Sequence, residues 1–206
     1  MSLKWLPNLV TILRCVLAII VGYTILRFDQ HVRAGDPVAA WTFIPFILFT
    51  ITAATDWLDG ALARGLDATS AFGARLDPIA DKLLTASSLL ALAHIENWSW
   101  FVMLPAIAIV GRDFLMTAIR ESLGNPTSLK VSNAAKWKTA LALVSIGALL
   151  LGLALSQMAA DATRYAWDWL FSRGVLMAGL FGIWVTAILS VATATEYVKG
   201  LTSKTD

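Results

Sequence analysis

The sequence has little of the residue types that build disulfide frameworks and soft-metal sites, with one cysteine and two histidines among 206 residues. The lone Cys15 cannot form an intrachain disulfide. Acidic and basic residues nearly balance, and a net charge of +2 provides no basic surface of the kind that binds nucleic acid. These shortages exclude a disulfide-stapled domain and argue against a nucleic-acid partner.

Apolar sequence is abundant. Hydrophobic residues make up 58% of the chain and the mean hydropathy is +0.70, whereas a soluble domain is about 45–50% apolar. The apolar residues gather in runs of about twenty, which suffice to cross a hydrocarbon core of about 30 Å as helix. We therefore predict an all-α polytopic membrane protein with six transmembrane helices in one bundle, forming a single domain over residues 1–206. The expected spans are Leu6–Leu26, Val38–Leu62, Ser70–His94, Trp98–Ile119, Ala134–Gln157 and Leu170–Tyr197, and a polar stretch, Arg27–Asp36, follows the first.

Lysines and arginines outside the spans indicate how the bundle sits in the bilayer. One side would carry the basic residues near both chain ends, Arg64 and the segment Lys130–Lys138. The other side would carry fewer basic residues. Because basic loops are retained in the cytoplasm, we expect both termini to be cytoplasmic. Tryptophans near the span ends, such as Trp41 and Trp98, fit the aromatic belts of the two membrane interfaces.

Four aspartates occupy positions that a membrane protein normally avoids. Asp56 and Asp59 stand near the end of the second span, and Asp77 and Asp81 near the start of the third. Residues three or four apart share a helix face, and a short connection favours two antiparallel neighbours, so all four carboxylates can converge. The alternative is a set of solvated helix ends paired with arginines.

Converging carboxylates repel one another, and each costs a few kcal/mol or more within a membrane. Protonation or bound cations would offset that cost. Neither histidine belongs to the cluster, and all-oxygen ligation suits hard ions such as Mg²⁺, Mn²⁺ or Ca²⁺ better than zinc. Two such ions can clamp a pyrophosphate and stabilise the attacking and leaving oxygens.

The spacing Asp56-x₂-Asp-Gly-x₂-Ala-Arg-x₈-Gly-x₃-Asp-x₃-Asp81 resembles the signature of the CDP-alcohol phosphotransferases at every fixed position. The resemblance implies that Asp56, Asp59, Asp77 and Asp81 bind two divalent cations, Mg²⁺ or Mn²⁺, and that Asp81 is the base that deprotonates the acceptor alcohol. A Pro-Asn-x-x-Thr stretch at the start of the first span is similar to the family's nucleotide site. The residues implied to bind the CDP-lipid are Asn8, Thr11, Gly60, Arg64, Ser70 and Gly73.

A second polar group follows in spans four and five. Arg112, Arg120, Lys136 and Lys138 can form a basic pocket opposite the acids, which suits a phosphate on the acceptor. Positive-inside anchoring is the alternative for at least one of the lysines. Asp113 follows Arg112 directly and cannot share its helix face, so we expect each of the two to have its own partner.

These stretches are similar to the branch of the family that uses a phosphorylated glycerol. The resemblance implies transfer of a phosphatidyl group from CDP-diacylglycerol to glycerol 3-phosphate, by a homodimer in a bacterial inner membrane with its active site facing the cytoplasm. Inositol phosphate and phosphatidylglycerol stay open as acceptors. From another class, the acids could line a cation or proton pathway of a transporter, although no repeat or broken-helix pattern supports one.

Overall fold

The computed structural model describes residues 6–36, 40–66, 71–122, 133–161 and 166–202, and this part of the chain is helical without strands. One short 3₁₀ turn, η2, precedes the second helix. The elements are α1 (Leu6–Ala34), η2 (Ala40–Phe43), α2 (Ile44–Leu66), α3 (Ala71–Ile95), α4 (Trp100–Ser122), α5 (Asn133–Asp161) and α6 (Ala166–Thr202).

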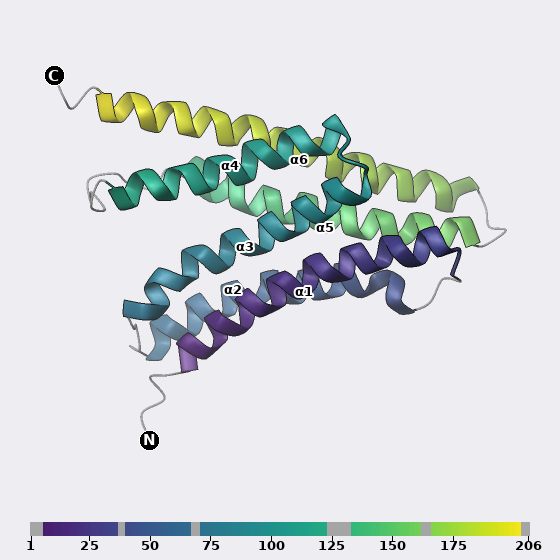
Figure 1. Cartoon of the computed structure of the whole chain (residues 1–206), viewed down its shortest axis with the longest axis horizontal. Coiled ribbons are helices and arrows are strands. Elements are labelled where there is room, and N and C mark those ends of the chain that lie inside the picture. The colour runs from purple at the N-terminus through teal and green to yellow at the C-terminus, as the bar shows by residue number, and fades with distance from the viewer. Residues whose placement is uncertain (1–5, 37–39, 67–70, 123–132, 162–165, 203–206) are drawn as a thin grey trace.

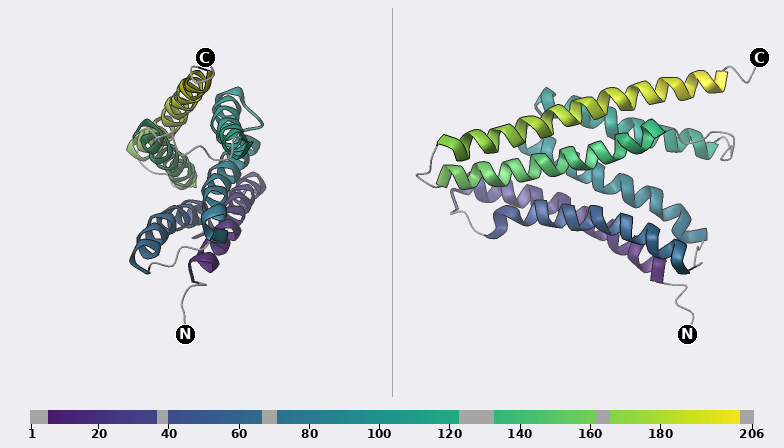
Figure 2. Two further views of the ribbon diagram at one scale, coloured as in Figure 1. Left: turned by 90° about the vertical axis from the view of Figure 1, so that its left-hand side faces the viewer. Right: turned by 180° about the vertical axis from the view of Figure 1, so that it is seen from behind.

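Successive helices run in opposite directions along one elongated bundle (Figures 1 and 2). As a result α1, α3 and α5 begin at the same end of the bundle at which α2, α4 and α6 finish. We call this the motif end, because the aspartate-bearing parts of α2 and α3 lie there, and we call the opposite end the distal end. The predicted all-α class is confirmed.

Four helices are long and apolar enough to cross a membrane, over Leu9–Ala34, Trp100–Ile119, Trp137–Ala160 and Trp167–Thr195. Their outward faces carry large apolar side chains, such as Phe101, Val144 and Phe181, which are 68, 69 and 72% exposed. In water such surfaces would drive aggregation, whereas a bilayer solvates them. The chain is an integral membrane protein. Two shorter apolar stretches, Trp41–Thr55 over η2 and α2 and Lys82–Ile95 in α3, fall below that length within the described residues.

The two most extensive helix contacts are α5 with α6 and α1 with α3. Ser87 of α3 donates a 2.7 Å hydrogen bond to the carbonyl oxygen of Ala18 in α1, next to the fully buried Val21 and Ile25. Between α5 and α6 the backbones approach so closely that a Cβ added at Gly179 would lie 2.8 Å from the nitrogen of Leu149. Small residues at helix contacts are the usual means of close packing in membranes.

The stretch Arg27–Asp36 is polar, as expected, but Leu26 does not end the helix, because α1 continues to Ala34. Its last turns are amphipathic and carry their own side-chain pairs. Arg33 Nε lies 2.7 Å from Asp29 Oδ2, and Arg27 donates to the Gln30 side chain at 3.0 Å. Pairs at this spacing stabilise a helix, and Gly35, with φ of 73°, ends it. The helix therefore projects beyond the apolar run.

The two aspartate-bearing helices are linked mainly by a third helix, α1, and make little direct contact with each other. In the described structure α2 and α3 touch only slightly, whereas α1 packs against both. The expectation that α2 and α3 pack directly as antiparallel neighbours is thus wrong over most of their length. A short connection fixes how close two helix ends lie, but it does not decide which helices pack along their length.

Candidate active site

The four aspartates lie on the helix segments that meet at the motif end. Asp56 and Asp59 are in the last three turns of α2, and Asp77 and Asp81 are in the first three turns of α3. Because both segments are continuous helix, the spacing of three and four residues puts the backbone positions of each pair on one side of its helix. The side chains of all four are outside the described part, so their convergence stays a prediction.

The chemistry of the donor set at the motif end fits a hard cation. Both histidines lie far from it, His31 near the end of α1 and His94 near the end of α3, at the distal end. No imidazole is thus available to the aspartates, and carboxylates alone favour an ion of the Mg²⁺ or Mn²⁺ type. Within the described side chains, no three His, Cys, Asp or Glu residues gather as a metal site.

The remaining predicted residues distribute around the same end. Asn8 and Thr11 are on the first turns of α1, Arg120 is on the last turns of α4, and Lys136 is on the first turn of α5. The side chain of Thr11 is buried and has an interaction partner, as does that of Arg14 three residues later. Gly60 and Arg64 are on α2 and Gly73 is on α3. Ser70 lies outside the described residues, and so do the side chains of Asn8, Arg64, Arg120 and Lys136.

A partly buried polar cluster joins α4, α5 and α6 toward the motif end. One carboxylate oxygen of Asp113 accepts from Arg112 at 3.0 Å and from Lys138 at 2.5 Å. A second arm of the Arg112 guanidinium donates to Thr193 Oγ1 at 3.1 Å. Lys138 is only 3% exposed, so its charge depends on this carboxylate rather than on water. We call these four residues the Asp113 cluster.

The expectation that Arg112 and Asp113 each have their own partner is confirmed, by Thr193 and Lys138, and the two residues also pair with each other, which was not expected. The long arginine side chain reaches around the helix to its neighbour, and Lys138 approaches the same carboxylate from α5. Two of the four predicted acceptor residues, Arg112 and Lys138, are thereby brought together. With one acid between two bases, the cluster carries a net positive charge when all three groups are ionised.

Thr193 was missed in the sequence, where α6 was interpreted from hydropathy alone. A signal was present, because Thr186, Ser190 and Thr193 are spaced by four and three residues and so share one helix face. Thr186 and Ser190 are fully buried. A polar stripe on a membrane helix usually faces the bundle interior, which would have placed α6 beside the site.

The comparisons with known proteins cover nearly the whole chain. A family model described as CDP-alcohol phosphatidyltransferase matches residues 4–194. The chain belongs to the CDP-alcohol phosphatidyltransferase family. The matched region contains the four aspartates, both predicted nucleotide residues of α1 and the Asp113 cluster.

Individual relatives agree with the family match. A CDP-diacylglycerol–glycerol-3-phosphate 3-phosphatidyltransferase of Cereibacter sphaeroides is 32% identical, over 96% of this chain and 96% of its own length. One of Haemophilus influenzae is 28% identical, over 94% of this chain and 91% of its own. A cardiolipin synthase (CMP-forming) of Oryza sativa subsp. japonica is 32% identical, over 74% of this chain and 46% of its own.

Family membership makes the chain an enzyme of phospholipid biosynthesis and gives the two helix ends a chemical context. CDP-alcohol phosphatidyltransferases generally depend on divalent cations, which agrees with a donor set made of carboxylates. Family membership also accounts for the charged residues in a bundle that lipid surrounds, because intramembrane charges are retained where function needs them.

Proposed function

We propose that this chain transfers the phosphatidyl group of CDP-diacylglycerol to glycerol 3-phosphate, giving phosphatidylglycerophosphate and CMP. The observation that carries the acceptor is the Asp113 cluster, in which Arg112 and Lys138 meet within the bundle toward the end that bears the aspartates. A positive group at that place fits an acceptor with its own phosphate. The names of the Cereibacter and Haemophilus relatives support the same reaction.

The four aspartates, Asp56, Asp59, Asp77 and Asp81, would hold two divalent cations at the motif end. When bound, these ions would neutralise charge on the pyrophosphate of the donor. Residues of the chain would do the remaining work. The CDP part of the donor would lie against Asn8, Thr11, Gly60, Arg64, Ser70 and Gly73.

Asp81 would accept the proton of the acceptor hydroxyl as the hydroxyl oxygen attacks the phosphorus nearest the lipid. A new P–O bond forms there, and the bond from that phosphorus to the bridging oxygen of the pyrophosphate breaks. The electron pair leaves with CMP, so no covalent enzyme intermediate is needed. The contribution of the protein is alignment of two charged substrates, which can lower a barrier by several kcal/mol.

The acceptor phosphate would bind between Arg112 and Lys138, and Arg120 and Lys136 at the same end would add charge. Arg112 offers a planar fork of donors, of which one arm is held by Thr193 and another by Asp113. An arginine held in this way loses less conformational freedom on binding an oxyanion. The cluster would therefore be arranged before the acceptor arrives.

In the bilayer all six helices would cross, so that both termini and the motif end face the cytoplasm. The chain would act as one domain in the inner membrane of a bacterium, as a homodimer. The positive-inside bias of the sequence supports this orientation. In the structure, the starts of α1 and α5 and the ends of α4 and α6 lie together at the motif end, as the proposed topology requires.

A second candidate keeps the chemistry and changes the acceptor to phosphatidylglycerol. The rice relative named cardiolipin synthase (CMP-forming) favours it. A phosphodiester carries less charge than the phosphate of glycerol 3-phosphate and would gain less from Arg112 and Lys138. The Asp113 cluster therefore favours the phosphorylated small alcohol.

CMP release by the purified protein in detergent tests the proposal, with CDP-diacylglycerol, Mg²⁺ and one acceptor at a time. We expect release with glycerol 3-phosphate and not with inositol phosphate or phosphatidylglycerol, and no release in EDTA. Asp77→Asn should slow release about a thousandfold or more, because loss of metal-held charge costs several kcal/mol in the transition state. Asp168→Asn is the matched control, since Asp168 is exposed on the first turn of α6 at the distal end.

Each outcome has a clear meaning. Release driven by phosphatidylglycerol alone would replace the acceptor and leave the reaction type intact. Full release in EDTA would remove the two-cation site. Equal loss in Asp77→Asn and Asp168→Asn would show damage to the fold in place of a role for Asp77.

A further inference from the structure

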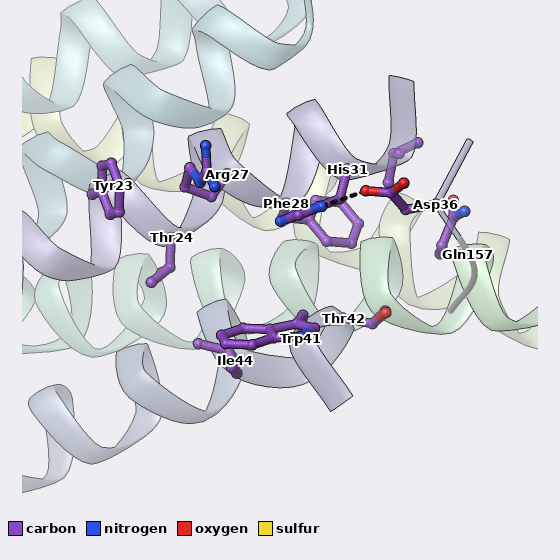
Figure 3. A pocket seen from close by; sticks show the side chains of 11 residues that line it. Tyr23, Thr24, Arg27, Phe28, His31, Asp36, Trp41, Thr42, Ile44 and Gln157 are labelled. Carbon is purple, nitrogen blue, oxygen red and sulfur yellow. Dashed lines mark hydrogen bonds and ion pairs between the residues drawn. The ribbon is translucent and has the colours of Figure 1, made fainter. Parts of the chain in front are cut away.

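A cavity of about 590 Å³ lies at the distal end, away from the proposed reaction. It is bounded by the last turns of α1, by η2 with the start of α2, and by Gln157 of α5 (Figure 3). Its wall on α1 runs from Tyr23 to His31, about 12 Å at 1.5 Å per residue. In the predicted topology this wall runs from Tyr23, near the end of the first span, across the membrane interface to His31.

The walls and the mouth of this cavity differ in chemistry. Tyr23, Phe28 and Trp41 provide aromatic walls. Tyr23 and Trp41 are 58 and 67% exposed, so the cavity is open sideways to whatever surrounds the bundle. In a bilayer that surrounding is lipid, and aromatic side chains with a polar tip favour this depth. An acyl chain is the natural occupant of such walls.

The charges at the mouth fit a phosphodiester. His31 Nδ1 donates to Asp36 Oδ2 at 2.6 Å, which orients the imidazole ring. Arg27 stands one turn before His31, and one arm of its guanidinium donates to Gln30 at 3.0 Å. Asp36 is engaged by the His31 ring, and Arg27 is the cation at the mouth whose other N–H groups can meet a phosphate. Arginine is the side chain that best combines apolar packing with phosphate contacts at a membrane surface.

A second cavity shows what an apolar crevice without this mouth looks like. It measures about 310 Å³ and lies among leucines of α3, α5 and α6, with Phe101 of α4. The charged residue in its lining is Glu96, which would repel a phosphate. Unlike this crevice, the cavity beside α1 combines aromatic walls with an arginine at its mouth.

We infer that the cavity beside α1 binds one glycerophospholipid from the leaflet opposite the aspartates. Its phosphodiester lies at Arg27 and His31, and one acyl chain lies along Tyr23, Phe28 and Trp41. This site is separate from the donor and acceptor sites and does not depend on the reaction that the enzyme catalyses.

Native mass spectrometry of the full-length protein tests the inference by titrating phosphatidylglycerol into detergent micelles. Dioleoylglycerol, which has the same chains and no phosphate, is the comparison ligand. We expect Arg27→Gln to weaken retention of phosphatidylglycerol about tenfold, the effect of losing a charged hydrogen-bond partner. Arg173→Gln is the matched control, because Arg173 is exposed near the start of α6 and stacks on Trp169, 4.4 Å from the ring centre.

A second variant blocks the cavity without changing its charge. Ile44→Trp places a larger side chain in the lining beside Trp41, and we expect the same loss of bound phospholipid. Equal retention in Arg27→Gln, Ile44→Trp and Arg173→Gln would overturn the site. Retention of dioleoylglycerol as strong as that of phosphatidylglycerol would overturn the role of the phosphate.

Discussion

At the scale of single residues, the carboxylate of Asp113 is the centre of the proposed acceptor pocket. One oxygen accepts from both Arg112 and Lys138. Without it two like charges would face each other in a site where water is scarce, because Lys138 is buried. Removing one partner of a buried ion pair costs about 3–5 kcal/mol. In the proposed acceptor pocket Asp113 would therefore be a positioning residue, which holds two cations at one place without touching the substrate.

Replacement of Asp113 should act on the acceptor and spare the donor. In Asp113→Asn we expect the KM for glycerol 3-phosphate to rise about tenfold or more. Without the carboxylate, Arg112 and Lys138 would move apart and could no longer both contact the phosphate. The KM for CDP-diacylglycerol should change little, and Asp113→Glu should restore the acceptor KM. Initial rates of CMP release over both substrates measure these constants.

A purely structural role for Asp113 would give another pattern. Both KM values would then stay at their wild-type levels, while the thermal unfolding midpoint alone would fall. Unchanged acceptor KM in Asp113→Asn would also remove Lys138 from the proposed phosphate site.

At the scale of helices, α5 and α6 form the most extensive contact in the described structure. An added Cβ at Gly179 would lie 2.8 Å from the nitrogen of Leu149 and 3.0 Å from the oxygen of Ser145. Both atoms belong to backbone and cannot rotate away. The close approach of these helices helps to bring Lys138 of α5 to Asp113 and Thr193 of α6 to the neighbouring Arg112.

Gly179→Ala should therefore destabilise the bundle, by about 1–3 kcal/mol as for other overpacked interiors. Gly174→Ala on the same helix is the control, because nothing lies within 4 Å of its added Cβ. Both changes gain the same helix propensity, so their difference isolates the contact. Thermal unfolding in detergent should place Gly179→Ala below Gly174→Ala, and equal midpoints would contradict the close packing.

Hydropathy predicted the helices well and their partners poorly. Runs of about twenty apolar residues gave the helical class, because the bilayer imposes that length. The same rule failed at Arg27–Asp36, where polar pairs continue α1 beyond the apolar run. It also could not show that α1 packs against both α2 and α3, since side-chain shape and not hydropathy selects neighbours.

The site residues that lie close together in the sequence could be predicted, whereas those far apart in the sequence could not be brought together without the fold. The aspartates follow helical intervals, and helices α2 and α3 place their backbones at one end of the bundle. Arg112 and Lys138 are distant in sequence, and only the fold brings them to one carboxylate. The metal ligation by Asp56, Asp59, Asp77 and Asp81 stays a prediction, as do the contacts of the CDP-lipid.

At the scale of the whole molecule, the proposed orientation can be measured in intact cells. In a Cys15→Ser background, Ala34→Cys places a thiol at the exposed end of α1, and Ser203→Cys places one beyond α6. We expect a membrane-impermeant maleimide to label Ala34→Cys in intact bacterial cells, with Ser203→Cys labelled only after permeabilisation. Cys15→Ser without a new cysteine is the control.

The reverse labelling pattern would invert the bundle and put the aspartates outside the cytoplasm. Labelling of both positions from the same side would contradict the proposed topology. Either α1 would not cross the membrane once, or the total number of crossings would not be even. Either result would leave the reaction chemistry untouched and change the compartment that supplies the acceptor.

The gathering of the site-bearing helix ends at one end of the bundle has a consequence for the membrane. If donor and acceptor meet there, each turnover removes one two-chain lipid from a leaflet and returns one two-chain lipid to the same leaflet. The lipid count of that leaflet is then unchanged, and so is the balance of area between the two leaflets. What changes is the charge of the lipid headgroup, because CMP leaves and glycerol 3-phosphate is attached in its place. The enzyme would thus alter the surface potential of one membrane face without bending the membrane.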